Sequence, residues 1–94
     1  MITGLREMED EICEAVYKDL GRDKFISKLA EITLCVATAE HDIQHVDSYA
    51  KEYEEPTELV LGPGTTLIKY EPLGVMAIFG AWNYPFTVVL KPLI

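Results

Sequence analysis

Residues 70–86 read YEPLGVMAIFGAWNYPF, and the predicted fold follows from this segment. Residues 75–79 form a continuous apolar run, which fits either a strand buried on both faces of a parallel sheet or a buried helix. The flanking Gly74 and Gly80 disfavour a helix that runs through them, so we predict a strand. Together with the helices predicted below, this strand indicates the α/β class.

The predicted strand is followed by an unusual turn. Residues 82–86 place three aromatic rings, a carboxamide and a proline where a connection ordinarily uses small polar residues. Pro85 suits the first turn of a helix through residues 87–90, whose free peptide N–H groups would favour an anion. Asn83 can donate two hydrogen bonds to a developing oxyanion at this ligand-binding edge. From the residue type alone, an Asn that only closes the turn is the simpler interpretation.

Two parts of the sequence resemble the aldehyde dehydrogenase superfamily. Residues 71–75 (EPLGV) and 80–86 (GAWNYPF) are similar to its first Rossmann strand and the following turn. Residues 10–22 (DEICEAVYKDLGR) are similar to the N-terminal helix of its class 3, fatty-aldehyde branch, and residues 27–49 match the next helix more loosely. Ala81 stands where many members have Pro, which marks that branch. The resemblance implies the N-terminal part of the aldehyde dehydrogenase fold.

The resemblance implies a role for each residue of the turn. Asn83 would stabilise the tetrahedral oxyanion that forms when a cysteine thiolate attacks an aldehyde. Tyr84 would border the substrate tunnel. The nicotinamide side of NAD or NADP would contact Phe79, Gly80, Ala81, Trp82 and Asn83. For Trp82, an aromatic anchor in the core is an equally good interpretation.

The resemblance also implies that the parent protein is an oxidoreductase that converts aldehydes to carboxylic acids through a cysteine thiohemiacetal. That reaction needs a cysteine nucleophile, a glutamate that activates water and a nicotinamide cofactor. Cys13 and Cys35 fall within helical patterns as small apolar residues, and neither matches the family's nucleophile, which lies far downstream. We therefore expect this chain alone to be inactive.

Complete members of this superfamily are several times longer than these 94 residues. The sequence ends at Ile94 inside a predicted helix, without a glycine or polar stop signal. We therefore expect a fragment of the parent enzyme, which the resemblance implies is a homodimer with an aldehyde substrate. The alternative is a short, non-catalytic product that docks on full-length subunits as an interaction module, through its hairpin edge and apolar strand.

Two amphipathic helices are predicted in the first half of the chain. Apolar residues recur at three- and four-residue steps from Leu5 to Leu20, and Gly21 is the expected C-terminal stop. A second pattern with these steps runs from Phe25 to Ala50. It resembles a coiled coil, but a long core helix folded over a sheet or a neighbouring helix is the simpler interpretation.

The middle of the chain predicts a β-hairpin. Residues 57–61 and 65–70 are short strand-like runs on either side of a Gly-Pro-Gly turn, after a polar connector at residues 51–56. We divide the chain into three parts. Residues 1–56 form helices that pack on the NAD-binding domain, and residues 57–72 form a hairpin that the resemblance assigns to an oligomerisation arm. Residues 73–94 form the truncated start of the NAD(P)-binding Rossmann domain.

Charge and composition exclude several partners. The formal charge of −8 argues against nucleic acid, and the lack of a basic run argues against anionic membrane surfaces. His41 and His45 have a metal-compatible spacing, but no third ligand is evident, so we predict no metal site. The two cysteines lack a CxxC spacing, which suits a reducing compartment. With no signal segment or apolar span, we expect a cytoplasmic protein; the resemblance allows a membrane anchor only in a C-terminal tail outside these residues.

Overall fold

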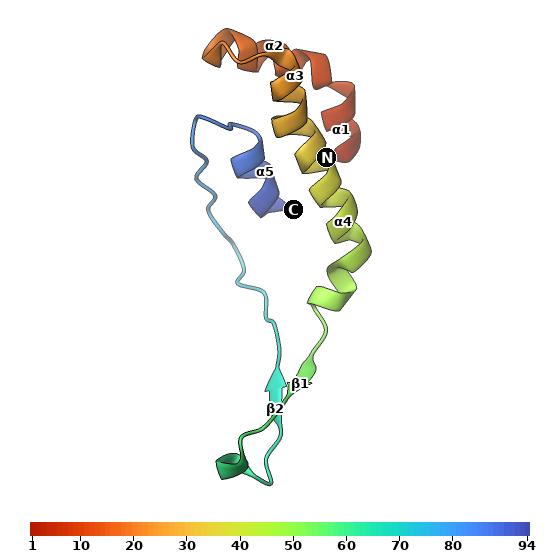
Figure 1. The fold of residues 1–94 in the computed structure, drawn as a ribbon, viewed down its shortest axis with the longest axis vertical. Coiled ribbons are helices and arrows are strands. Elements are labelled where there is room, and N and C mark those ends of the chain that lie inside the picture. The colour runs from red at the N-terminus through yellow and green to blue at the C-terminus, as the bar shows by residue number, and fades with distance from the viewer. The chain divides into compact units, whose positions relative to one another are not determined.

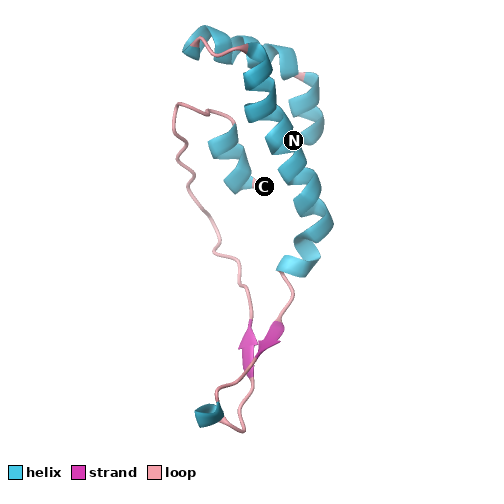
Figure 2. Cartoon of the chain, viewed as in Figure 1, coloured by secondary structure: helices cyan, strands magenta, loops and turns pink.

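The computed structural model describes all residues of the chain, Met1–Ile94, and divides them into two compact units. The first unit combines Met1–Ile43 with Ala77–Ile94, and the second comprises Gln44–Met76. The first unit is helical, whereas the paired strands lie in the second (Figure 1 and Figure 2). This combination of helices with a two-stranded antiparallel sheet confirms the predicted α/β class.

The first predicted helix is present but is divided into α1 (Ile2–Glu7) and α2 (Glu9–Leu20). Met8 separates them with φ −99° and ψ 14°, which lies outside the α-helical region. Acidic residues fill the first turn of α2, where the helix dipole stabilises them. The helix ends at Gly21, which has φ 66° and donates its N–H to the carbonyl of Tyr17 at 2.8 Å, so the predicted stop is confirmed.

The second predicted helix is also present. It consists of three consecutive pieces, which are α3 (Lys24–Ser27), the π-helix η1 (Lys28–Thr33) and α4 (Leu34–Tyr49). The side chain of Asp23 caps its start, because Oδ1 accepts the N–H of Phe25 at 2.9 Å and that of Ile26 at 3.3 Å. The sequence does not predict the π-helix.

The π-helix changes which side of this long helix is buried. Its i→i+5 bonding places more residues in a turn than an α-helix does, so the buried face rotates along the axis. Phe25 and Leu29, which the sequence places on the buried face, are 70% and 48% exposed. Ser27, Glu31 and Cys35 have no exposed surface instead. The carboxylate of Glu31 therefore lies in the interior of the first unit.

The core of the first unit lies between α1, α2, η1, the start of α4 and α5 (Thr87–Leu93). Its buried apolar residues are Leu5, Ile12, Cys13, Val16, Ile32, Cys35 and Val36. Phe86 and Leu90 of the C-terminal segment pack against them. Both cysteines are free and buried, which confirms that they serve as small apolar core residues.

The second unit contains the predicted hairpin. β1 (Tyr53–Glu55) pairs antiparallel with β2 (Thr66–Ile68), which lies inside the predicted second strand. The first strand, however, precedes the predicted residues 57–61. Pro56 ends β1 because it has no N–H to donate, and Leu59–Leu61 form a short 3-10 helix, η2, with exposed side chains.

The predicted strand at residues 75–79 is not formed in this structure. Val75 and Phe79 are 102% and 94% exposed, and the segment has no regular hydrogen bonding. A buried parallel strand needs neighbouring strands to bond its N–H and C=O groups, and β1 and β2 pair only with each other. The apolar pattern of this segment therefore has no sheet to join among these 94 residues.

Candidate functional site

Residues 82–86, which we call the Asn83 turn, lead directly into α5. The start of that helix is bound by a remote carboxylate. Oε2 of Glu31 accepts the N–H of Phe86 at 3.1 Å and the N–H of Thr87 at 2.9 Å. Glu31 lies on η1 and is completely buried. Its carboxylate therefore caps α5 and satisfies two donors that the first turn of a helix leaves unpaired.

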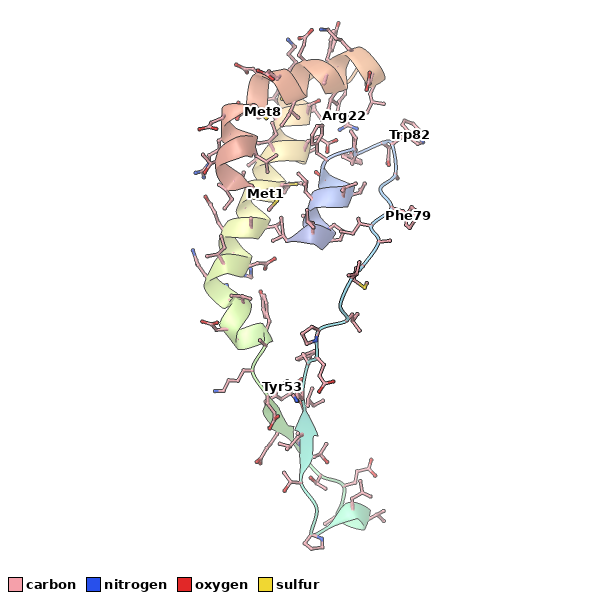
Figure 3. The ribbon with its side chains drawn as sticks, turned by 180° about the vertical axis from the view of Figure 1, so that it is seen from behind. Met1, Met8, Arg22, Tyr53, Phe79 and Trp82 are labelled. Carbon is pink, nitrogen blue, oxygen red and sulfur yellow. The ribbon has the colours of Figure 1, made fainter.

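Arg22 connects the same carboxylate to the Asn83 turn. Nη1 of Arg22 donates to Oε1 of Glu31 at 2.6 Å, and Nη2 donates to the main-chain carbonyl of Asn83. The guanidinium lies over the ring of Tyr84, with Cζ 4.5 Å from the ring centre. The Arg22 side chain is only 17% exposed, and Figure 3 shows it beside the loop that carries Trp82. One cation thus contacts three groups, two of which belong to the turn.

Further contacts fix α5 next to this network. The hydroxyl of Thr87 donates to the carbonyl of Ala30 and accepts the thiol of Cys35, whose Sγ is 3.8 Å away. A Cβ atom on Gly80 would lie 2.3 Å from Cγ2 of Val89, so the chain approaches α5 this closely only because residue 80 is glycine. The predicted cofactor residue Gly80 therefore has a packing role in this structure.

The predicted anion-binding end of α5 is not available. Glu31 already accepts the N–H groups of Phe86 and Thr87, and the N–H of Val88 donates to the carbonyl of Tyr84 at 3.1 Å. A carboxylate at this position would also repel a phosphate group. The predicted preference of these N–H groups for an anion is therefore met by the carboxylate of Glu31, and the two groups are not free to bind an anionic ligand.

The remaining predicted site residues lie on the surface. Phe79 and Trp82 are 94% and 78% exposed and point away from the ribbon (Figure 3). Trp82 is therefore not a core anchor in this structure. Ala81 and Asn83 are also exposed, although the main-chain carbonyl of Asn83 is fixed. The structure thus brings Asn83 and Tyr84 together around one guanidinium and leaves the other two aromatic side chains outside the network.

The sequence does not assign Arg22 and Glu31 to the site. The hydrogen bond between Glu31 and Phe86 joins residues 55 positions apart, which no local spacing can indicate. One signal was present, however. Ser27, Glu31 and Cys35 follow one another at four-residue steps and form a helical stripe of small and polar residues beside the apolar pattern.

Cys13 is unsuited to act as a nucleophile. It is 4% exposed, and burial, followed by the charges of Glu9 and Asp10, raises the pKa of its thiol. An attacking cysteine needs a lowered pKa, because the thiolate is the reactive form. This environment agrees with the expectation that the catalytic cysteine is a different residue.

Comparison with known proteins identifies the family. Residues 1–94 match the sequence model of the aldehyde dehydrogenase family. The chain therefore belongs to the aldehyde dehydrogenase family, and its helices and hairpin are consistent with the N-terminal part of that mixed α/β fold.

Several curated relatives are family 3 members. A family 3 aldehyde dehydrogenase of Dictyostelium discoideum is 37% identical over 90 residues, which cover 96% of this chain and 19% of that protein. The 4,4'-diaponeurosporen-aldehyde dehydrogenase of Staphylococcus aureus is 33% identical over 90 residues, with 96% and 20% covered. Family 3 member B2 of Mus musculus is 29% identical over 90 residues, with 96% and 19% covered. The two relatives that are named as family 3 members confirm the predicted class 3 branch. The chain spans about a fifth of the length of all three relatives.

Proposed function

We propose that this chain forms the oxyanion-binding part of an NAD(P)-dependent aldehyde dehydrogenase, which oxidises aldehydes to carboxylic acids through a cysteine thiohemiacetal. The observation that carries the proposal is the family match over residues 1–94. Within this match, Asn83 is exposed on a turn whose main chain is held by a part-buried ion pair. The three relatives described above are themselves named as aldehyde dehydrogenases.

Asn83 acts on the aldehyde oxygen in this proposal. When a thiolate attacks the carbonyl carbon, the π electrons of the C=O bond move to oxygen, and the side-chain N–H of Asn83 donates to the resulting oxyanion. A donor of this kind, held in place before the reaction, contributes about 100- to 1,000-fold in rate. Because Cys13 and Cys35 are buried, neither is the attacking thiolate in this proposal.

NAD or NADP, when bound, accepts the hydride from the substrate carbon. The exposed residues that suit contact with the nicotinamide side are Phe79, Gly80, Ala81, Trp82 and Asn83. The start of α5 does not fit the diphosphate, since Glu31 occupies its N–H groups. We therefore assign only nicotinamide-side contacts to this chain, and Tyr84 to the border of the substrate tunnel.

The substitution Asn83→Ala in the full-length enzyme that carries this sequence tests the proposal. We expect kcat to fall about 100-fold or more, because the oxyanion loses its donor, while the KM for the cofactor changes little. Gln44→Ala is the control, since Gln44 is an exposed carboxamide outside the turn. Unchanged turnover in Asn83→Ala would remove the oxyanion assignment.

A non-catalytic interaction module is the second candidate function. Leu59 and Val60 are 101% and 88% exposed, and apolar side chains presented in this way mark docking surfaces. Co-purification of the 94-residue chain with a full-length aldehyde dehydrogenase, without added activity, would support this role. Binding of NAD by the chain alone would contradict it.

We also propose that the full-length enzyme is a cytoplasmic homodimer. Cys13 and Cys35 are both free thiols, as is usual in a reducing compartment. No helix combines the length and the apolar character needed to cross a membrane. Sedimentation equilibrium of the purified enzyme and fractionation of cells that express it test the two statements separately.

A further inference from the structure

The ion pair of Arg22 and Glu31 does more than cap a helix. Asp23 caps α3 from the surface, which shows that a local carboxylate suffices for that purpose. Burial of a carboxylate and a guanidinium costs desolvation energy, which is offset only when both groups are fully hydrogen-bonded. Both oxygens of Glu31 and both terminal nitrogens of Arg22 make hydrogen bonds, and no buried side-chain nitrogen or oxygen atom lacks a partner. A fully satisfied network of this kind holds its members in one geometry.

The network ends on the Asn83 turn and the residue that follows it. Arg22 contacts the carbonyl of Asn83 and the ring of Tyr84. Glu31 accepts the N–H groups of Phe86 and Thr87. The bond to the Asn83 carbonyl holds the peptide plane that follows this residue, and this plane contains the Cα atom that carries the Asn83 side chain. The exposed side chain of Asn83 is the part of the turn that the network leaves free to meet a ligand.

We propose that Arg22 is a positioning residue for Asn83, and that Glu31 holds Arg22 in place. The inference rests on the proposed function, because it assigns Arg22 to the geometry of the oxyanion donor. The role needs an arginine: its two terminal nitrogens reach Glu31 and the Asn83 carbonyl while its face covers Tyr84. A lysine at this position would keep the charge opposite Glu31 but could not make all three contacts.

The test uses Arg22→Lys and Arg22→Met in the full-length enzyme that carries this sequence. Displacement of a catalytic group by about 1 Å can cost about 100-fold in rate, so we expect each variant to lower kcat by about 10- to 100-fold with little change in the KM values. Arg22→Lys retains the ion pair and so protects folding. The matched control is Arg6→Met, because Arg6 pairs with Glu40 at 2.5 Å on the surface, with 60% and 47% of the two side chains exposed. We expect this control to leave kcat unchanged.

A double-mutant cycle separates positioning from general structural support. If Arg22 acts through Asn83, Arg22→Lys has no further effect on kcat in the Asn83→Ala background, because the group that it positions is absent. If Arg22→Lys lowers kcat by the same factor in the wild-type and the Asn83→Ala enzymes, the two residues act independently and the proposal is overturned. The proposed function is tested separately: if Asn83→Ala leaves kcat unchanged, Asn83 is not the oxyanion donor. A loss in Asn83→Ala with no loss in Arg22→Lys overturns only the positioning role.

Discussion

The substitution Glu31→Gln would remove the buried charge of the first unit while keeping the shape of the side chain. The amide oxygen of the glutamine can still accept the N–H groups of Phe86 and Thr87. Its amide nitrogen would then face Nη1 of Arg22, at the position where Oε1 now accepts a bond of 2.6 Å, so two donors would point at each other. The loss therefore falls on the ion pair and not on the helix cap.

The size of this loss can be worked from burial. Removal of one partner from a buried ion pair costs about 3–5 kcal/mol. Glu31 has no exposed surface, but Arg22 is 17% exposed and recovers part of its hydration. We therefore expect the free energy of unfolding to fall by about 2–3 kcal/mol. For a chain of this size, this corresponds to a fall in Tm of about 10–20 °C.

Urea unfolding of the 94-residue chain, followed by far-UV circular dichroism, measures this change. The midpoint should fall while the slope of the transition stays the same, because the surface exposed on unfolding is unchanged. Glu40→Gln is the control: Glu40 also pairs with an arginine, but 47% of its side chain is exposed, so the loss should stay within about 1 kcal/mol. Equal losses in the two variants would refute the assignment of Glu31 to a buried network.

Two further predictions concern the packing of α5 and the chemistry of a core cysteine. Gly80→Ala should lower the free energy of unfolding by about 1–3 kcal/mol, because the new Cβ would lie 2.3 Å from a methyl group of α5. Gly4→Ala is the control: the space around Gly4 is open, so this substitution should not destabilise the chain in the same urea titration. Because burial raises the pKa of the Cys13 thiol, iodoacetamide at pH 8 should alkylate it much more slowly in the folded chain than in urea; equal rates would contradict this. The raised pKa also links stability to pH: its contribution is fully present below the pKa of the thiol in the unfolded chain, and it is lost as the pH rises through the higher pKa of the folded chain.

Local signals in the sequence predict the helical elements well. Gly21 ends α2 in the left-handed conformation, and Pro85 precedes α5, because both residues restrict the backbone at their own positions. The burial of Cys13 and Cys35 follows equally from their places in apolar patterns. The motif around Asn83 indicates the family, which the comparison of residues 1–94 confirms.

Features that depend on distant partners could not be predicted in this way. An apolar run such as residues 75–79 indicates burial in a sheet, but a strand forms only where another strand supplies its hydrogen bonds. The bond from Phe86 to Glu31 spans 55 positions, and the helix pattern alone places Leu29, not Glu31, on the buried face. The sequence therefore predicts Asn83 as the donor of the site, but it does not predict Arg22 and Glu31, which contact the turn only through tertiary packing.

The π-helix η1 makes the chain sensitive to changes in length. Its extra residue within Lys28–Thr33 sets the rotational offset between α3 and α4. Deletion of one residue from this stretch would favour a continuous α-helix and turn everything before it by about 100° relative to α4. Glu31 could then no longer face both Arg22 and α5. Homologous enzymes that use this network should therefore tolerate substitutions in the stretch more readily than single-residue insertions or deletions.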